Sequence, residues 1–173
     1  MIANVMQTPR IEKVTVNIGV GESGEKLGKA EKLLQKLTSK KPVRTVSKRK
    51  IPTWDLKKGE PIGCKVTLRG KDAVEIIKRT LYAKNNALNP GNFDTTGNVS
   101  YGIQEYLDIQ GLKYDPEIGI FGMNVNVNLE HPGYSIQRRA RKNVKVPQKA
   151  RVQRDEAIEF MKNNFGVKIE EED

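Results

Sequence analysis

Three segments of this chain alternate apolar and polar residues with a period of two, and this pattern restricts the fold more than any other feature. The segments cover residues 13–19, 61–70 and 122–130. Such alternation is typical of a strand that has one face in a core and the other in contact with solvent or a partner. The sequence therefore predicts a half-buried β-sheet, whose core positions are Val14, Val16, Ile18, Ile62, Cys64, Val66, Leu68, Met123, Val125, Val127 and Leu129.

Three other segments repeat their apolar residues at intervals of three and four, which predicts amphipathic helices. They cover about residues 25–37, 71–83 and 154–164, and Pro42 and Gly166 end the first and the last of them. Two shorter strands are expected at 43–47 and 101–110, and residues 85–98 are expected to be loop. The apolar helix positions are Leu27, Ala30, Leu33, Leu34, Leu37, Ala73, Val74, Ile77, Leu81, Ile158, Met161 and Phe165.

Strands joined partly by helices and partly by short loops predict an α+β fold. We expect a single domain over residues 1–173, with a mainly antiparallel sheet, helices packed on one face and the other face exposed for a partner. A length of 173 residues is enough for one core. The chain has one cysteine and one histidine, which excludes an internal disulfide and is too few for the usual zinc site, so we expect no metal.

A glycine-rich segment, Gly19 to Gly24, has the G-x-G-x-x-G spacing of a dinucleotide-binding turn. An oxidoreductase is therefore one functional alternative. The fingerprint also needs a carboxylate about 20 residues later, and that region carries lysines and Arg44 instead. Glu22 would also lie inside a turn that should attract phosphate. We interpret the segment as a strand-to-helix connection, and expect no cofactor.

The positive charge is concentrated in two short segments. The chain has net charge +10; residues 40–58 hold eight Lys/Arg and one Asp, and residues 138–154 hold eight Lys/Arg and no acid. Concentrated positive charge of this kind is suited to a polyphosphate backbone. Neither segment has the broad apolar face that would insert into a membrane, and apolar runs are too short for a membrane span or a signal peptide. We expect a cytoplasmic protein with a mobile basic loop at about 47–60 and a basic segment at about 138–154.

The polar side of the predicted sheet combines cations with short hydrogen-bonding side chains. Such residues suit phosphates, sugar hydroxyls and base edges, although a solvated sheet face would look similar. Catalysis has little support, because His131 lacks a recognisable nucleophile partner. The predicted binding residues of this face are Lys13, Thr15, Asn17, Lys65, Thr67 and Arg69.

Several segments, in order along nearly the whole chain, resemble one family. They are "IEKVTVNIGVGESGEKLGKAEKLL", "KKPVRT", "GEPIGCKVTLRG" and "YDPEIGIFGMNV". They look like the 5S-rRNA-binding L-five family of large-subunit ribosomal proteins, and "HPGYSIQRR" with "EAIEFMKNNFGVKI" resembles its archaeal and eukaryotic branch. The resemblance implies a non-enzymatic protein of the central protuberance that grips 5S rRNA with its sheet face. It also implies that the glycine turn is scaffold.

The resemblance also assigns roles and partners. It implies 5S rRNA contacts at Asn17, Lys40, Thr67 and Arg69, with Thr45 and Lys65 nearby. Lys40 and Asn124 depart from the family pattern, in which Gln and Asp are common. The other implied partners are 23S-type rRNA, P-site tRNA, the other 5S rRNA-binding protein and a small-subunit head protein across the intersubunit bridge.

The basic loop is expected to approach P-site tRNA, with Trp54 exposed. Its implied contacts are Lys48, Arg49, Lys50, Trp54, Lys57 and Lys58. The basic segment is expected to add RNA contacts through Arg138, Arg139, Arg141 and Lys142.

Overall fold

The computed structural model describes residues 5–170, and its main element is a five-stranded sheet in the order β2-β3-β1-β6-β5. Every pairing in this sheet is antiparallel. A separate parallel pair joins two short strands, β4 (Ala87–Leu88) and β7 (Lys168–Ile169). The strands of the large sheet are β1 (Arg10–Gly19), β2 (Val43–Val46), β3 (Pro61–Leu68), β5 (Val99–Ile103) and β6 (Met123–Glu130).

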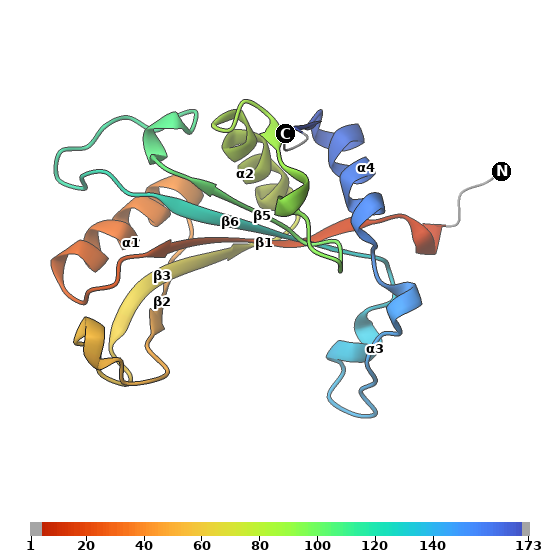
Figure 1. The fold of residues 1–173 in the computed structure, drawn as a ribbon, viewed down its shortest axis with the longest axis horizontal. Coiled ribbons are helices and arrows are strands. Elements are labelled where there is room, and N and C mark those ends of the chain that lie inside the picture. Colours follow the sequence, from red (N-terminus) through yellow and green to blue (C-terminus); the bar gives the residue numbers. More distant parts are fainter. Residues whose placement is uncertain (1–4, 171–173) are drawn as a thin grey trace.

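Three helices cover one side of the large sheet. They are α1 (Glu25–Thr38), α2 (Lys71–Tyr82) and α4 (Arg154–Phe165), and Figure 1 shows them above the strands. The short α3 (Ser135–Arg138) lies on the opposite side of the sheet, at one end. The loop between β2 and β3 lies on that same side at the other end (Figure 1). The predicted α+β fold with helices on one face is confirmed. We call the uncovered side of the large sheet the open face.

The core lies between the sheet and the helices, where the predicted alternation and helix spacing place their apolar residues. Val14, Val16 and Ile18 are fully buried, as are Leu34 of α1 and Ile77 of α2. Burying a side chain of this size contributes about 1.5–3 kcal/mol. The helices therefore form mainly because their apolar stripes pack against the apolar side of the strands. Their intrinsic helix propensity contributes less.

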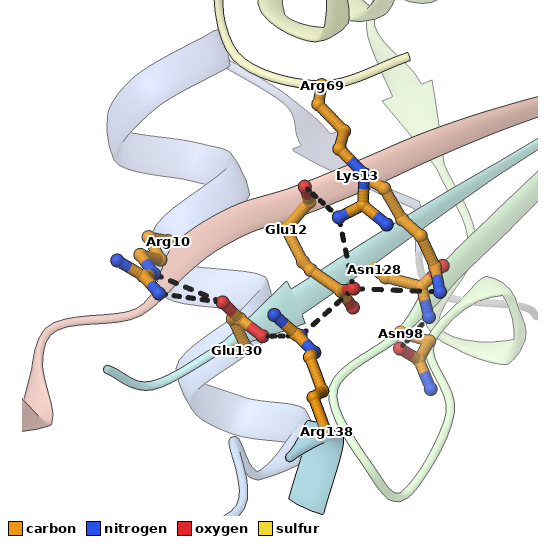
Figure 2. A network of polar contacts seen from close by, with 8 residues as sticks. All are labelled: Arg10, Glu12, Lys13, Arg69, Asn98, Asn128, Glu130 and Arg138. Atoms are coloured by element: carbon orange, nitrogen blue, oxygen red, sulfur yellow. Dashed lines mark hydrogen bonds and ion pairs between the residues drawn. The ribbon is translucent and has the colours of Figure 1, made fainter. Parts of the chain in front are cut away.

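A β-bulge in β1 changes the phase of the alternation. Ile11 pairs with Leu129 and Lys13 pairs with Asn128, so Glu12 is an extra residue with no partner in the register. Without it, Ile11 and Val14, which are three positions apart, would point to opposite faces. The bulge puts both on the core side, and it brings Glu12 beside Lys13 at the open face (Figure 2).

Two predicted segments differ from the structure. The strand expected at 101–110 is β5 only as far as Ile103, and a 3-10 turn follows at Tyr106–Asp108. Tyr106 is buried, and its hydroxyl accepts a hydrogen bond from the backbone N–H of Asp115 at 3.2 Å. These contacts stabilise the turn in place of a longer strand. The expected loop at 85–98 contains β4, because its partner β7 lies some 80 residues further along and no local pattern marks it.

Candidate nucleic-acid interface

The open face carries rows of polar side chains that run across neighbouring strands. Antiparallel partners project to the same face, so the pairing defines each row. One row joins Lys65, Asn17 and Asn124, and a second joins Thr67, Thr15, Asn126 and Ser100. The two strand faces predicted separately from alternation therefore form one continuous surface.

Three asparagines of β6 belong to this surface and were not among the predicted binding residues. Asn124 is exposed and Asn126 is half-buried. Asn128 is half-buried as well, and its amide donates to Asn98 Oδ1 at 3.0 Å. Their alternation with valines was visible in the sequence. The pairing of β6 with β1 was not, and without it nothing connected these residues to Thr15 and Asn17.

Thr45 lies at the β2 edge of the open face because residue 63 is glycine. Thr45 pairs with Gly63. A β-carbon on Gly63 would come within 2.9 Å of the Thr45 hydroxyl and 2.7 Å of the Ile18 carbonyl oxygen. Thr45 therefore shares the open face with Lys65, which pairs with the same strand, while its neighbour Arg44 turns to the helix side and pairs with Glu31 of α1, where it lowers the pKa of that carboxyl.

Lys40 lies outside the rows of the open face. It follows α1 in the turn whose Ser39 has a left-handed backbone, and its ammonium pairs with Asp72 Oδ2 at 3.0 Å. Asp72 belongs to the first turn of α2, three residues after Arg69 in the chain. The structure therefore places this predicted contact at the border of the face, next to the helices.

Arg69 and Lys13 lie at one end of the open face, near the basic segment (Figure 2). Arg69 is exposed immediately after β3, and its Nη1 is 3.3 Å from Glu12 Oε1. Lys13 Nζ lies 3.6 Å from the same oxygen atom. The cations predicted in β1 and after β3 are therefore brought together around one carboxylate.

The basic loop has a defined shape. Ser47 is buried, and the backbone N–H of Gly59 donates to its carbonyl oxygen at 2.9 Å. Ile51 and Leu56 form a bridge around a 3-10 turn at Pro52–Trp54, where the sequence predicted no regular structure. Trp54 is 69% exposed, which confirms the prediction for this ring. The five cations of the basic loop are also exposed: Lys48, Arg49, Lys50, Lys57 and Lys58.

The basic segment begins at the last residue of α3, Arg138, which joins it to the sheet, and further along the segment Val146 and Val152 are buried. The Arg138 guanidinium contacts the carboxylates of Glu12 and Glu130. The next predicted contacts differ from it: Arg139 donates its Nε–H to the Lys142 carbonyl oxygen at 2.8 Å, and Arg139, Arg141 and Lys142 are exposed. Arg138 is thus partly a structural ion-pair residue, and its neighbours present their charge to solvent.

The glycine-rich turn has a structural explanation. The N–H of Gly21 donates to the Ile62 carbonyl oxygen at 2.9 Å, so it is not directed at a phosphate. Gly21 and Gly24 have φ values of 78° and 110°, which favour glycine. The strand before this turn has only antiparallel neighbours, whereas a dinucleotide-binding sheet is parallel.

The remaining reactive side chains are buried inside the fold. Burial raises the pKa of the Cys64 thiol to about 11, so it is protonated at neutral pH. His131 is buried after β6, and its Nε2 lies 3.2 Å from Glu156 Oε2 of α4. Within residues 5–170, no group of three or more His, Cys, Asp or Glu could hold a metal, and no helix is long and apolar enough to span a bilayer.

An α+β scaffold with a helix-covered core and a polar, cation-bearing open face belongs to the class of structural binding proteins. Two family models match consecutive parts of the chain: the model described as "Ribosomal protein L5" matches residues 4–57, and the model for the C-terminus of the same ribosomal family matches residues 61–160. The first contributes β1 and β2 and the second β3, β5 and β6, so both build the same sheet.

Curated relatives agree with these matches over nearly the whole chain. "Large ribosomal subunit protein uL5" of Methanosphaera stadtmanae is 53% identical over 167 residues, covering 96% of this chain and 99% of the relative. The proteins of the same name from Sulfurisphaera tokodaii and Sulfolobus acidocaldarius are 53% and 52% identical, over 97% and 96% of this chain. The chain therefore belongs to the ribosomal protein L5 family, which consists of structural proteins of the large ribosomal subunit and not of enzymes. The oxidoreductase alternative is wrong.

Proposed function

We propose that this protein binds 5S rRNA through its open face, in the central protuberance of the large subunit. The observation that carries the proposal is the continuity of the polar row from Thr67 to Ser100, which crosses four strands. Strands lie about 4.8 Å apart, so the five-stranded face is on the order of 19 Å wide. That width accommodates several nucleotides. The rows contain no aromatic ring, so base stacking on this face is not part of the proposal.

The chemistry of the rows matches the groups that RNA presents. Lysine and arginine at positions 13, 65 and 69 bind phosphate, and arginine does so in a two-pronged geometry. The threonines and asparagines between them can exchange hydrogen bonds with ribose 2′-hydroxyls and with base edges. The residues that alternate with them along the strands are apolar and buried in the core. One face of each strand therefore packs while the other is available for recognition.

The two basic stretches extend this surface on the same side of the sheet (Figure 1). We assign the basic loop to the P-site tRNA, because its exposed Trp54 can pack on a ribose or base while the five cations meet the backbone. We assign Arg139, Arg141 and Lys142 to 23S-type rRNA. Neighbouring ribosomal proteins, including the other 5S rRNA-binding protein and a small-subunit head protein, are proposed partners of the assembled particle.

A gel-shift titration tests the proposal. The full chain is titrated against 5S rRNA and against an unrelated structured RNA of equal length, at several salt concentrations, with a dinucleotide titration as a negative control. About five phosphate contacts would give a log-log salt slope of roughly −3.5 to −4.5. Equal affinity for both RNAs, or a slope near zero, would show that the open face does not recognise 5S rRNA.

A further inference from the structure

Two acidic side chains lie at the end of the open face, among the residues proposed to bind RNA (Figure 2). Glu12 is the extra residue of the β1 bulge, and Glu130 is the last residue of β6. The Glu12 side chain is 14% exposed and that of Glu130 only 3%. Acidic groups beside an RNA surface repel phosphate, so their presence here needs a reason.

Cations from three separate parts of the chain converge on Glu12. Its Oε1 lies 2.9 Å from Arg138 Nη2, 3.3 Å from Arg69 Nη1 and 3.6 Å from Lys13 Nζ. Arg69 also directs Nη1 toward the backbone carbonyl of Glu12, at 3.5 Å. One carboxylate thus ties together β1, the turn after β3 and the start of the basic segment.

Glu130 completes the arrangement from the neighbouring strand. Arg10 donates to its Oε1 through Nε at 3.2 Å and through Nη2 at 2.9 Å, and Arg138 contacts its Oε2. Arg138 therefore bridges the two carboxylates. Four cations surround two anions, so the cluster keeps a net charge of about +2 while the carboxylates offset the repulsion between the guanidinium groups.

The cations retain the capacity to bind a phosphate. Arg69 is 60% exposed on its side chain and uses Nη1 for both of its contacts with Glu12, whereas a guanidinium has five N–H donors. Arg138 is 47% exposed and Lys13 is 34% exposed. An arginine held in one orientation loses less side-chain entropy when it binds than one that is free to rotate.

We propose that Glu12 is a positioning residue for RNA binding, which orients Arg69 and Arg138 toward the phosphate backbone, and that Glu130 fixes Arg138 from the other side. This inference rests on the proposed function. It has a consequence that opposes simple electrostatics: removing a negative charge at this place weakens the binding of a polyanion.

The test compares Glu12→Gln with a matched control, Glu75→Gln, which makes the same charge change on the exposed part of α2, on the helix side of the sheet. Binding to 5S rRNA is measured for both and for the unchanged chain, with thermal unfolding followed alongside. We expect Glu12→Gln to weaken binding at least fivefold although its net charge is higher. Glu75→Gln should leave affinity within twofold or slightly increase it.

A double-mutant cycle separates positioning from a general structural effect. If Glu12 acts through Arg69 and Arg138, then Glu12→Gln should cause a smaller loss of affinity in the Arg69→Gln variant than in the unchanged chain. Glu12→Asp, which keeps the charge on a shorter side chain, should bind with intermediate affinity, and it replaces Glu12→Gln in the comparison if that variant fails to fold.

The outcomes are distinguishable. Binding by the unchanged chain with equal or tighter binding by Glu12→Gln would overturn the positioning role and leave the proposed function intact. Additive losses in the cycle would also overturn it. Failure of the unchanged chain to prefer 5S rRNA over the unrelated RNA would overturn the proposed function and this inference together.

Discussion

Thr15 of β1 and Thr67 of β3 lie directly opposite each other on the open face. The residues on either side of them along the strands point to the core. These residues, which pair as Val14 with Leu68 and Val16 with Val66, are all buried. A slip of one residue in either strand would exchange these sets, placing threonines in the core and valines in solvent. The hydrophobic side therefore fixes the register, and the register in turn aligns the polar side for a partner.

Substitutions on the open face should affect RNA binding and not folding. We expect Arg69→Ala to weaken 5S rRNA binding by about 2 kcal/mol, or roughly 30-fold, because it removes charge-assisted hydrogen bonds. Thr67→Val should cost less, since a neutral hydroxyl makes weaker bonds. Gel shifts measure both, and circular dichroism follows folding. Lys78→Ala, an exposed cation of α2 on the other side, is the charge-matched control for Arg69→Ala. Unfolding of either open-face variant would show that these side chains are needed for folding.

The basic loop should be separable from the 5S rRNA site. Replacing residues 48–58 with a short Gly/Ser linker removes Trp54 and five cations but leaves the strands that carry the rows. We expect the melting temperature to be preserved and the 5S rRNA affinity to stay within about tenfold, or 1.4 kcal/mol. Ribosomes with the variant should retain P-site tRNA less firmly in a filter-binding assay.

A milder change examines the same loop. Trp54→Ala should reproduce part of the tRNA defect, and Trp54→Phe, which keeps an aromatic ring, should restore most of it. If replacing the loop abolished 5S rRNA binding, the loop would belong to the primary RNA site and the division between the two surfaces would be wrong.

Glu130→Gln should destabilise the fold moderately. Its carboxylate is buried but its partners Arg10 and Arg138 are partly exposed, so they return to water when the charge is lost and the cost stays below that of a fully buried pair. We expect a loss of about 1–2 kcal/mol in the free energy of unfolding. Urea denaturation measures it, with Glu75→Gln as the control, expected within about 0.5 kcal/mol. An unchanged midpoint would show that the cluster adds nothing to stability.

The Cys64 thiol should be unreactive in the folded protein. Burial raises its pKa to about 11, above the usual value near 8.5. Because the folded state holds this proton more tightly, the contribution of the group to stability is fully present below about pH 8.5 and is lost as the pH rises toward 11. Labelling with iodoacetamide at pH 8 should therefore be slow until urea unfolds the chain. Rapid labelling of the native protein would contradict the burial of this side chain.

The sequence by itself determined the core side of each long strand and helix. Alternation placed Val14, Cys64 and Val127 in the core, and helix spacing did the same for Leu34 and Ile77, because burial of apolar area decides these positions locally. It also identified Lys65 and Thr67 as polar-face residues and Trp54 as exposed. The resemblance to the L-five family, which runs in order along nearly the whole chain, was readable from the sequence as well.

Only the tertiary structure decided which strands are neighbours, and therefore which polar residues share a surface. Asn126 meets Thr15 across a separation of more than 100 residues, and no local pattern encodes that pairing. The β1 bulge, the separation of Lys40 from the rows, and the convergence of Arg69 and Arg138 on Glu12 follow from the same long-range contacts. Burial is a property of each segment and leaves a period in the sequence, whereas the partners of a polar side chain depend on how distant segments pack together.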